Sequence, residues 1–239
     1  MAAPGRRSNF EQRFEVRTRG RYAGPVASRP TRPDGAAPRA VRPAPAPTRP
    51  ALKVRYELRQ SELVDAAAGV FADRGYDSTP VHELAQQIGL AAGGIYHYFG
   101  SKEQLLIAIC DELVDPLLAR ARDLLEEQAD ATPEARLRAL VGVWVSHVVD
   151  HRDHMLVFQQ ERHQIERGAQ WEGVRRARKE FERLVEQVLA DVVSGEDRRV
   201  VLSALLGMVN HTAQWFDPRG RLDAGDVADG YVALVLGAR

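Results

Sequence analysis

The feature that most constrains this chain is the run TPVHELAQQIGLAAGGIYHYFGSKEQLL at 79–106. An apolar stripe with helical spacing over 81–88 predicts a short helix that begins at Pro80, where a fixed φ suits the first helical turn. Thr79 stands in front of it as a candidate cap. Gly89 ends the helix, because glycine takes a positive φ at little cost and lets the chain turn sharply. A second short helix follows the turn, and this helix-turn-helix arrangement holds one helix in a DNA groove.

The second short helix is predicted to meet DNA with small residues on its leading turn and with aromatic residues around its end. Small residues permit close approach to a groove wall or a phosphate, and Tyr and His supply donors for phosphates. These residues are Ala91, Ala92, Gly93, Gly94, Tyr96, His97 and Tyr98. Tyr98 and Phe99 also fit a role in the core. After Gly100, Ser101 is expected to cap a further helix on which Lys102 faces phosphate.

The segment upstream completes a three-helix unit. Apolar residues from Leu63 to Phe71 form a helical stripe within a helix predicted over 59–74, and Gly75 provides the stop. This stripe, the stripe at 81–88 and Ile95 can share one small core.

Residues 59–106 resemble the DNA-binding domain of the TetR/AcrR family of bacterial transcriptional regulators. The resemblance rests on the long first helix and its Gly, the Thr before the second helix, the I-Y-x-x-F cluster and the S-K-E-x-L that follows. It implies an all-α homodimer that places the second helix of the motif in the major groove of a palindromic operator. It also implies phosphate contacts at Thr79, Tyr96 and Lys102, and base contacts at Ala92, Gly94 and His97.

Two departures from the family pattern affect how DNA is read. Ala91 stands where the family often has a Ser or Thr cap, and each of Gly93 and Gly94 lowers helix propensity by roughly 1 kcal/mol relative to Ala. The helix offers few side chains that can make paired hydrogen bonds to bases. We therefore expect DNA shape or an N-terminal arm to contribute to specificity.

Composition narrows the class of protein. The 44% hydrophobic content of 239 residues suits a globular protein, and no apolar run reaches the ~18 residues of a membrane span. The N-terminus lacks the apolar segment of a secretory signal, and the single Cys110 fits a buried site in a reducing cytoplasm. Nucleophile-elbow, phosphate-loop, dinucleotide and zinc signatures are absent, so neither an enzyme nor a cofactor is expected. A helical protein with an enzymatic or pure interaction role is the alternative.

The charges are unevenly distributed. The whole chain has zero formal net charge, but residues 1–59 hold fourteen Lys or Arg and four acids. Nine of the thirteen prolines lie in 1–50, a segment without periodic apolar residues that is predicted to be disordered. A basic arm beside a helix-turn-helix can reach phosphates or a minor groove. The alternatives are an extension without function or a start site placed too far upstream, with Val54 as a candidate start.

The remainder reads as helix without strand alternation. We expect three parts: a disordered tail at 1–50, the helix-turn-helix domain at 51–106, and a helical effector-binding and dimerisation domain at 107–239. Its predicted helices are 102–128, 133–150, 153–166, 169–193, 197–216 and 226–236, and Thr132 is expected to cap the second of these. The last two are apolar nearly all round, which predicts burial on more than one side. The resemblance implies that they form the homodimer.

The resemblance also implies an effector pocket between the helices that follow the DNA-binding domain. Large aromatic groups and histidines on apolar stripes are candidates for its lining, although each alone fits a core position equally. Segments such as HRDHMLVFQQERHQI and ARKEFERLVEQVL resemble actinobacterial repressors of lipid and steroid catabolism that respond to acyl-CoA. The resemblance therefore implies that a small hydrophobic molecule or an acyl-CoA releases the repressor from DNA. Arg offers forked donors for CoA phosphates, the alternative being a solvated helix face. The predicted effector residues are Trp144, His147, Phe158, Arg162, Trp171, Arg178, His211 and Trp215, with Gln160, Arg175 and Arg176 as further candidates for CoA.

Four histidines have two interpretations, as metal ligands or as capping and solvated side chains. His147, His151 and His154 fall on one face of a continuous helix, with His163 nearby. The stretch 150–153 reads as a helix end, and no second shell rich in carboxylates is apparent. No metal is expected.

Overall fold

Helices make up all of the regular secondary structure in the described residues, which are 43, 45, 47–91, 93–193, 195 and 198–237 of this computed structural model. The α-helices are α1 (Pro50–Arg74), α2 (Val81–Gln87), α3 (Gly94–Phe99), α4 (Lys102–Glu127), α5 (Pro133–Asp150), α6 (Arg152–Gln160), α7 (Arg162–Arg167), α8 (Glu172–Ala190), α9 (Arg198–Trp215) and α10 (Ala224–Gly237), with a 3-10 turn, η2 (Ala169–Trp171), before α8. The all-α fold class is confirmed.

The first three helices form the predicted small unit. Phe71 of α1, Leu84 of α2 and Ile95 of α3 are fully buried together with the N-terminal part of α4. Gly89 and Gly100 have φ values of 72° and 78°, so both turns require the left-handed backbone that glycine adopts without strain. The predicted stops are therefore confirmed at both positions.

The limits of some helices differ from the prediction. Helix α1 begins at Pro50 rather than at Arg59, with proline in its first turn. The helix predicted over 153–166 is divided at Glu161 into α6 and α7. No Gly or Pro marks this break. Instead Arg175 of α8 donates to two backbone carbonyls beyond α6, at Ile165 and Gly168, each at 2.7 Å. A tertiary contact from α8 therefore accompanies the division of the predicted helix into α6 and α7.

Two of the predicted caps are confirmed and one is wrong. The hydroxyl of Ser101 accepts from the amide of Gln104 at 3.0 Å, and the hydroxyl of Thr132 accepts from an amide at the start of α5 at 3.3 Å. Thr79 does not cap α2. Its hydroxyl donates backward to the carbonyl of Gly75 at 2.8 Å, so it closes the turn between α1 and α2 instead.

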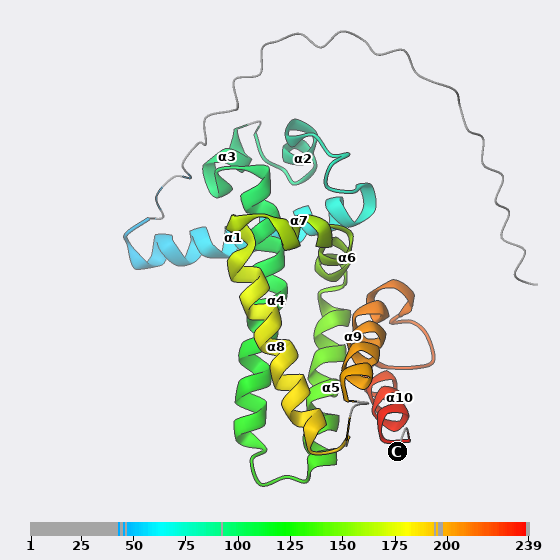
Figure 1. Cartoon of the computed structure of the whole chain (residues 1–239). Helices are drawn as coiled ribbons and strands as arrows, with labels where there is room; N and C mark the ends of the chain where they lie inside the picture. The colour runs from blue at the N-terminus through cyan, green and yellow to red at the C-terminus, as the bar shows by residue number, and fades with distance from the viewer. Residues whose placement is uncertain are drawn as a thin grey trace, which may run out of the picture. The chain divides into compact units, whose positions relative to one another are not determined.

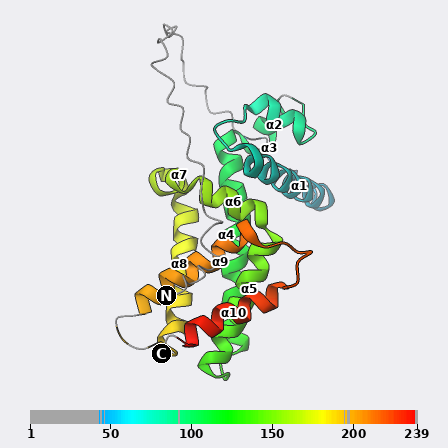
Figure 2. The same ribbon diagram turned by 90° about the vertical axis from the view of Figure 1, so that its right-hand side faces the viewer.

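Helix α4 joins the DNA-binding unit to the C-terminal helices (Figure 1). Its N-terminal part packs on α1 and α3, and the helix continues through Pro116 to pack on α5 and α8. Helices α9 and α10 lie against α5, as both views show (Figure 2). One continuous hydrophobic core links these elements from Leu63 to Val235.

Candidate DNA-binding surface and effector pocket

Helix α3, the candidate recognition helix, is short and begins with glycine. Gly93 is its N-cap residue and Gly94 is the first helical residue. A Cβ on Gly94 would lie 2.9 Å from the Cβ of Leu90, whereas a Cβ on Gly93 would meet nothing within 4 Å. Gly94 therefore permits the close packing of the turn against α3, and Gly93 is open toward the surface.

The aromatic residues of α3 divide between the surface and α1. His97 is exposed, and Tyr96 is partly buried. Tyr98 stacks on Tyr56 of α1 with ring centroids 5.1 Å apart, and the ring of His97 meets its edge at 5.2 Å. Burial, and then the neighbouring Tyr98, raise the pKa of Tyr56. Tyr56 was not predicted, because it lies in the segment that the sequence assigned to no helix.

Thr79 and Lys102, predicted to contact phosphate, make internal contacts in this structure. Thr79 is only 1% exposed. The ammonium of Lys102 donates to the carbonyl of Tyr76 and lies 4.1 Å from the centre of that ring, and burial lowers its pKa. Both residues hold the turn after α1. The other predicted DNA contacts among the described residues are Ala91, Gly93, Gly94, Tyr96, His97 and Tyr98. The predicted contact Ala92 lies outside the described residues.

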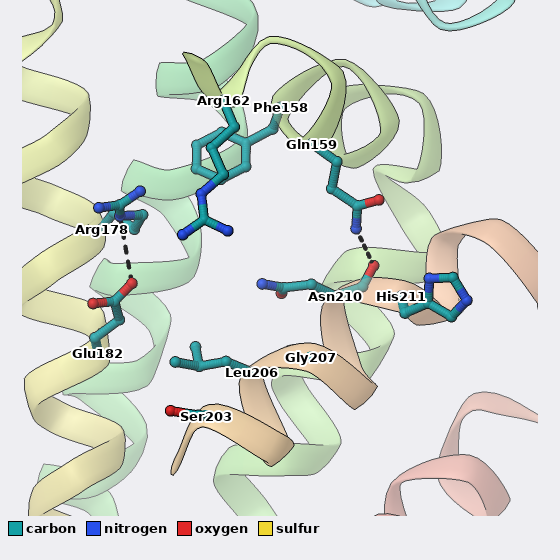
Figure 3. A pocket seen from close by; sticks show the side chains of 10 residues that line it. All are labelled: Phe158, Gln159, Arg162, Arg178, Glu182, Ser203, Leu206, Gly207, Asn210 and His211. Carbon is teal, nitrogen blue, oxygen red and sulfur yellow. Dashed lines mark hydrogen bonds and ion pairs between the residues drawn. The ribbon is translucent and has the colours of Figure 1, made fainter. Parts of the chain in front are cut away.

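A cavity of about 390 Å³ lies between α6, α7, α8 and α9, near several of the predicted effector residues (Figure 3). Four predicted residues line it: Phe158, Arg162, Arg178 and His211. Its size is within the usual range of ligand pockets, roughly 300–1,000 Å³.

A narrower apolar slot of about 50 Å³ adjoins this cavity and shares Phe158, Arg178, Glu182, Leu206 and Asn210 with it. The slot continues between α4, α5, α6 and α8. The residues that line only the slot are Leu113, Val114, Leu117, Trp144, Met155 and Phe181. Trp144, one of the predicted effector residues, thus lines the slot. The two spaces together offer a polar mouth and an apolar interior.

The two arginines of the cavity differ in their pairing. Arg178 donates to Glu166 at 2.7 Å and lies 3.4 Å from Glu182, and the bond from Arg178 is the main cause of the lowered pKa of Glu166. Arg162 has no ion pair with any residue in the described part of the chain, and its guanidinium points into the cavity (Figure 3). Arg162 is therefore the cation that remains available to an anionic ligand.

Polar groups on α6 and α9 close another side of the cavity. Gln159 donates to the carbonyl of Asn210 at 2.7 Å and accepts from Gln214 at 2.7 Å. Sequence reasoning missed Gln159, Asn210 and Ser203, since polar residues on a partly exposed helix carry no signal that distinguishes lining from solvated surface.

Three predicted effector residues line neither the cavity nor the slot. His147 hydrogen-bonds the carbonyl of Leu113 at 2.7 Å, and burial is the main cause of its lowered pKa. Trp171 is buried in η2 and donates to Glu103 at 3.3 Å. Trp215 is exposed at the end of α9.

The further CoA candidates also differ in position. Arg175 donates to the carbonyls of Ile165 and Gly168. Gln160 donates to the carbonyl of Ala72 at 3.3 Å, and Arg176 is exposed on α8.

A helix-turn-helix unit and a ligand-sized cavity joined by one long helix define a DNA-binding regulator that responds to a ligand. Two family models match: residues 63–109 match the bacterial regulatory proteins of the tetR family, and 130–238 match the tetracyclin repressor-like C-terminal domain. The chain belongs to the TetR family of transcriptional regulators.

The alignments with known relatives extend over most of the length of each relative. The HTH-type transcriptional repressor KstR2 of Mycolicibacterium smegmatis is 29% identical over 188 residues, which are 75% of this chain and 89% of that protein. The ketosteroid regulator KstR2 of Mycobacterium tuberculosis has a structure with a TM-score of 0.68 and 27% identity, covering 75% and 94% of the two chains. AibR in complex with isovaleryl coenzyme A and operator DNA has a TM-score of 0.61 and 28% identity, covering 74% and 97%.

These similarities establish the class of function. The protein is a ligand-responsive, DNA-binding transcriptional regulator, and its family and relatives are regulators and not enzymes. TetR regulators bind operator DNA as dimers and respond to small-molecule effectors. Within the described part of the chain, no helix has the length and apolarity needed to cross a membrane.

Proposed function

We propose that this protein is a homodimeric repressor that binds a palindromic operator through its two α3 helices and releases it when an acyl-CoA thioester binds. The observation that carries the proposal is the unpaired Arg162 at the mouth of a cavity that adjoins an apolar slot. An acyl-CoA has the matching distribution of properties, with anionic phosphates at one end and an apolar chain at the other. The isovaleryl coenzyme A in the structure of AibR supports this class of ligand.

The proposed binding mode follows the chemistry of the two spaces. The guanidinium of Arg162, and that of Arg178 if it exchanges its pairing with Glu166, would contact phosphate or pantetheine oxygens. The acyl chain would enter the slot beside Trp144 and Phe181, whose rings meet edge to face with their centroids 5.0 Å apart. Because this slot is small, a longer chain would have to part α4 from α8.

Helix α4 is the proposed link between effector and DNA. Leu113, Val114 and Leu117 of α4 line the slot, and the N-terminal part of the same helix packs against α3. Movement of α4 would therefore change the spacing of the two α3 helices in a dimer. The effector has to bind the DNA-incompetent state more tightly, and DNA then weakens effector binding by the same factor.

The proposed dimer interface is formed by α9 and α10. Val200 on α9 is 69% exposed and Leu234 on α10 is 63% exposed, and Trp215 and Leu222 add further exposed apolar surface. Exposed apolar surface of this kind is typical of an interaction site. A twin subunit that covered it would fix the distance between the two DNA-binding units.

Residues 1–50 are proposed to act as a basic arm on DNA, although only 43, 45 and 47–50 of them are described. Phosphate contacts from such an arm would steepen the fall of affinity with salt. Removing 1–49 should then reduce that slope, and an unchanged slope would contradict the arm. We also propose that the chain divides after residues 50 and 106 into the three predicted parts. The protein would act in the cytoplasm, where bacterial DNA lies.

A thermal-shift series with the purified full chain tests the effector. Acyl-CoA thioesters of increasing chain length are compared with free CoA and with the free acids. A ligand that binds only the folded state at 100 times its Kd adds about 2.7 kcal/mol of stability. We expect the thioester to raise the Tm more than either half does. No stabilisation across the whole series would contradict the acyl-CoA assignment.

A further inference from the structure

Three metal-binding side chains from three helices meet where α1 lies against the C-terminal helices. They are Asp65 of α1, Glu112 of α4 and His154 of α6, and one ligand atom of each lies within 4.8 Å of the others. Helices α1 and α6 pack extensively at this place. The cluster therefore spans the boundary between the DNA-binding unit and the effector-binding helices.

The Nε2 atom of the buried histidine of this cluster lacks a hydrogen-bond partner in the described part of the chain. His154 is only 5% exposed, and its Nε2 makes no hydrogen bond with any described residue. Asp65 Oδ1 lies 3.4 Å from this nitrogen, without the alignment of a hydrogen bond. Buried polar atoms are nearly always satisfied, and leaving one unpaired costs about 1–3 kcal/mol. An unsatisfied imidazole nitrogen that faces carboxylates in this way fits the coordination of a cation.

The charges around the cluster also favour a cation. Glu112 accepts only a long hydrogen bond of 3.5 Å from Ser61, and no Lys or Arg of the described residues forms an ion pair with Glu112 or Asp65. Burial, and then the charge of Asp65, raise the pKa of Glu112 to about 7. Burial is the main cause of the lowered pKa of His154, which keeps the imidazole in the neutral form that binds metals.

We propose that Asp65, Glu112 and His154 bind a first-row divalent transition-metal ion such as Zn²⁺. One imidazole nitrogen and two carboxylate oxygens form a donor set that suits such ions, with a fourth position for water. Donors around a tetrahedral ion at roughly 2.1 Å are about 3.4 Å apart. The Asp65–His154 pair already has this spacing. The side chain of Asp65 is 64% exposed and can rotate to complete the site.

The ion would act as a crosslink between two parts of the regulator. It would fix α1, which carries the DNA-binding unit, to α4 and α6, which line the slot and the cavity. Sequence reasoning grouped His154 with His147 and His151 on one helix. The structure instead supplies the other two donors from residues 42 or more positions away in sequence.

Zinc titration of the full chain, first freed of metal by a chelator, tests the site. Isothermal titration with ZnCl₂ should show one saturable site per chain, and Zn²⁺ should raise the Tm. Asp65→Asn and Glu112→Gln should each weaken binding at least tenfold, and Mg²⁺ should give no shift because the site contains an imidazole. Asp65→Asn is the main variant, since an exposed side chain can be changed without unfolding the protein.

His163→Gln is the matched control, because it removes an exposed histidine of α7 and should leave the zinc affinity unchanged. Co²⁺ provides a second readout, since its visible absorption should appear with the wild type and be absent with Asp65→Asn. The proposal is overturned if Zn²⁺ shows no saturable binding. It is equally overturned if Asp65→Asn and Glu112→Gln bind Zn²⁺ as tightly as the wild type.

Discussion

Tyr56 of α1 and Tyr98 of α3 stack with their ring centroids 5.1 Å apart and their planes inclined by 25°. This contact ties the candidate recognition helix to the first helix of the chain. Because α3 is short and begins with glycine, its orientation depends on such side-chain contacts more than on its own helical stability. The stack is therefore expected to hold α3 in the orientation that meets DNA.

Tyr56→Ala should weaken operator binding about fivefold, because an aromatic pair contributes roughly 0.5–1.5 kcal/mol beyond its buried area. Tyr56→Phe keeps the ring and should bind like the wild type. Fluorescence anisotropy with a fragment of the promoter measures both. Equal losses in the two variants would assign the effect to the hydroxyl instead of the stack.

The two adjacent glycines of α3 should respond differently to a methyl group. Gly94→Ala places a Cβ 2.9 Å from the Cβ of Leu90 and should destabilise the protein by about 1–3 kcal/mol. Gly93→Ala meets open space and should change stability by less than about 0.5 kcal/mol. Urea unfolding followed by circular dichroism compares the two. Similar stabilities would contradict the close packing of the turn on α3.

Arg162→Ala should reduce acyl-CoA affinity at least tenfold, because it removes the unpaired cation of the cavity. Arg176→Ala is the matched control, since Arg176 is exposed on α8 and does not line the cavity. Calorimetric titration with the thioester that gives the largest thermal shift measures both. Equal affinities of the two variants would remove Arg162 from the proposed site.

Leu234→Glu should disrupt the proposed dimer, because it places a charge on the exposed apolar face of α10. Light scattering after size-exclusion chromatography should give the mass of a dimer for the wild type and of a monomer for the variant. Leu58→Glu on α1 is the control, because Leu58 is 62% exposed and Leu234 is 63% exposed, and this variant should stay dimeric. A dimeric Leu234→Glu variant would contradict this interface.

Local patterns account for the parts of the fold that the sequence predicted. The apolar stripe at 81–88 and the glycines 89 and 100 act through neighbouring residues, so their spacing alone defines the helix-turn-helix. The caps Ser101 and Thr132 are local in the same sense.

The missed features depend on partners that are distant in the sequence. Lys102 donates to the carbonyl of Tyr76, a contact between residues 26 positions apart that no local pattern indicates. The start of α1 was not predicted, because the segment before Arg59 follows a proline-rich stretch. The stacking of Tyr56 on Tyr98 joins residues 42 positions apart, so no local pattern indicates it. Four residues that line the candidate effector cavity, namely Phe158, Arg162, Arg178 and His211, carried a signal in the sequence, whereas the amides Gln159 and Asn210 did not.

The most direct test of the central claim measures operator affinity with and without the effector. Anisotropy of a labelled promoter fragment is recorded at physiological salt, against random DNA of equal length, while the best acyl-CoA is titrated. We predict preferred binding of the promoter, at least tenfold weaker binding at saturating acyl-CoA, and an equal weakening of acyl-CoA binding by DNA. A promoter affinity that does not change with a saturating, bound acyl-CoA would contradict the account.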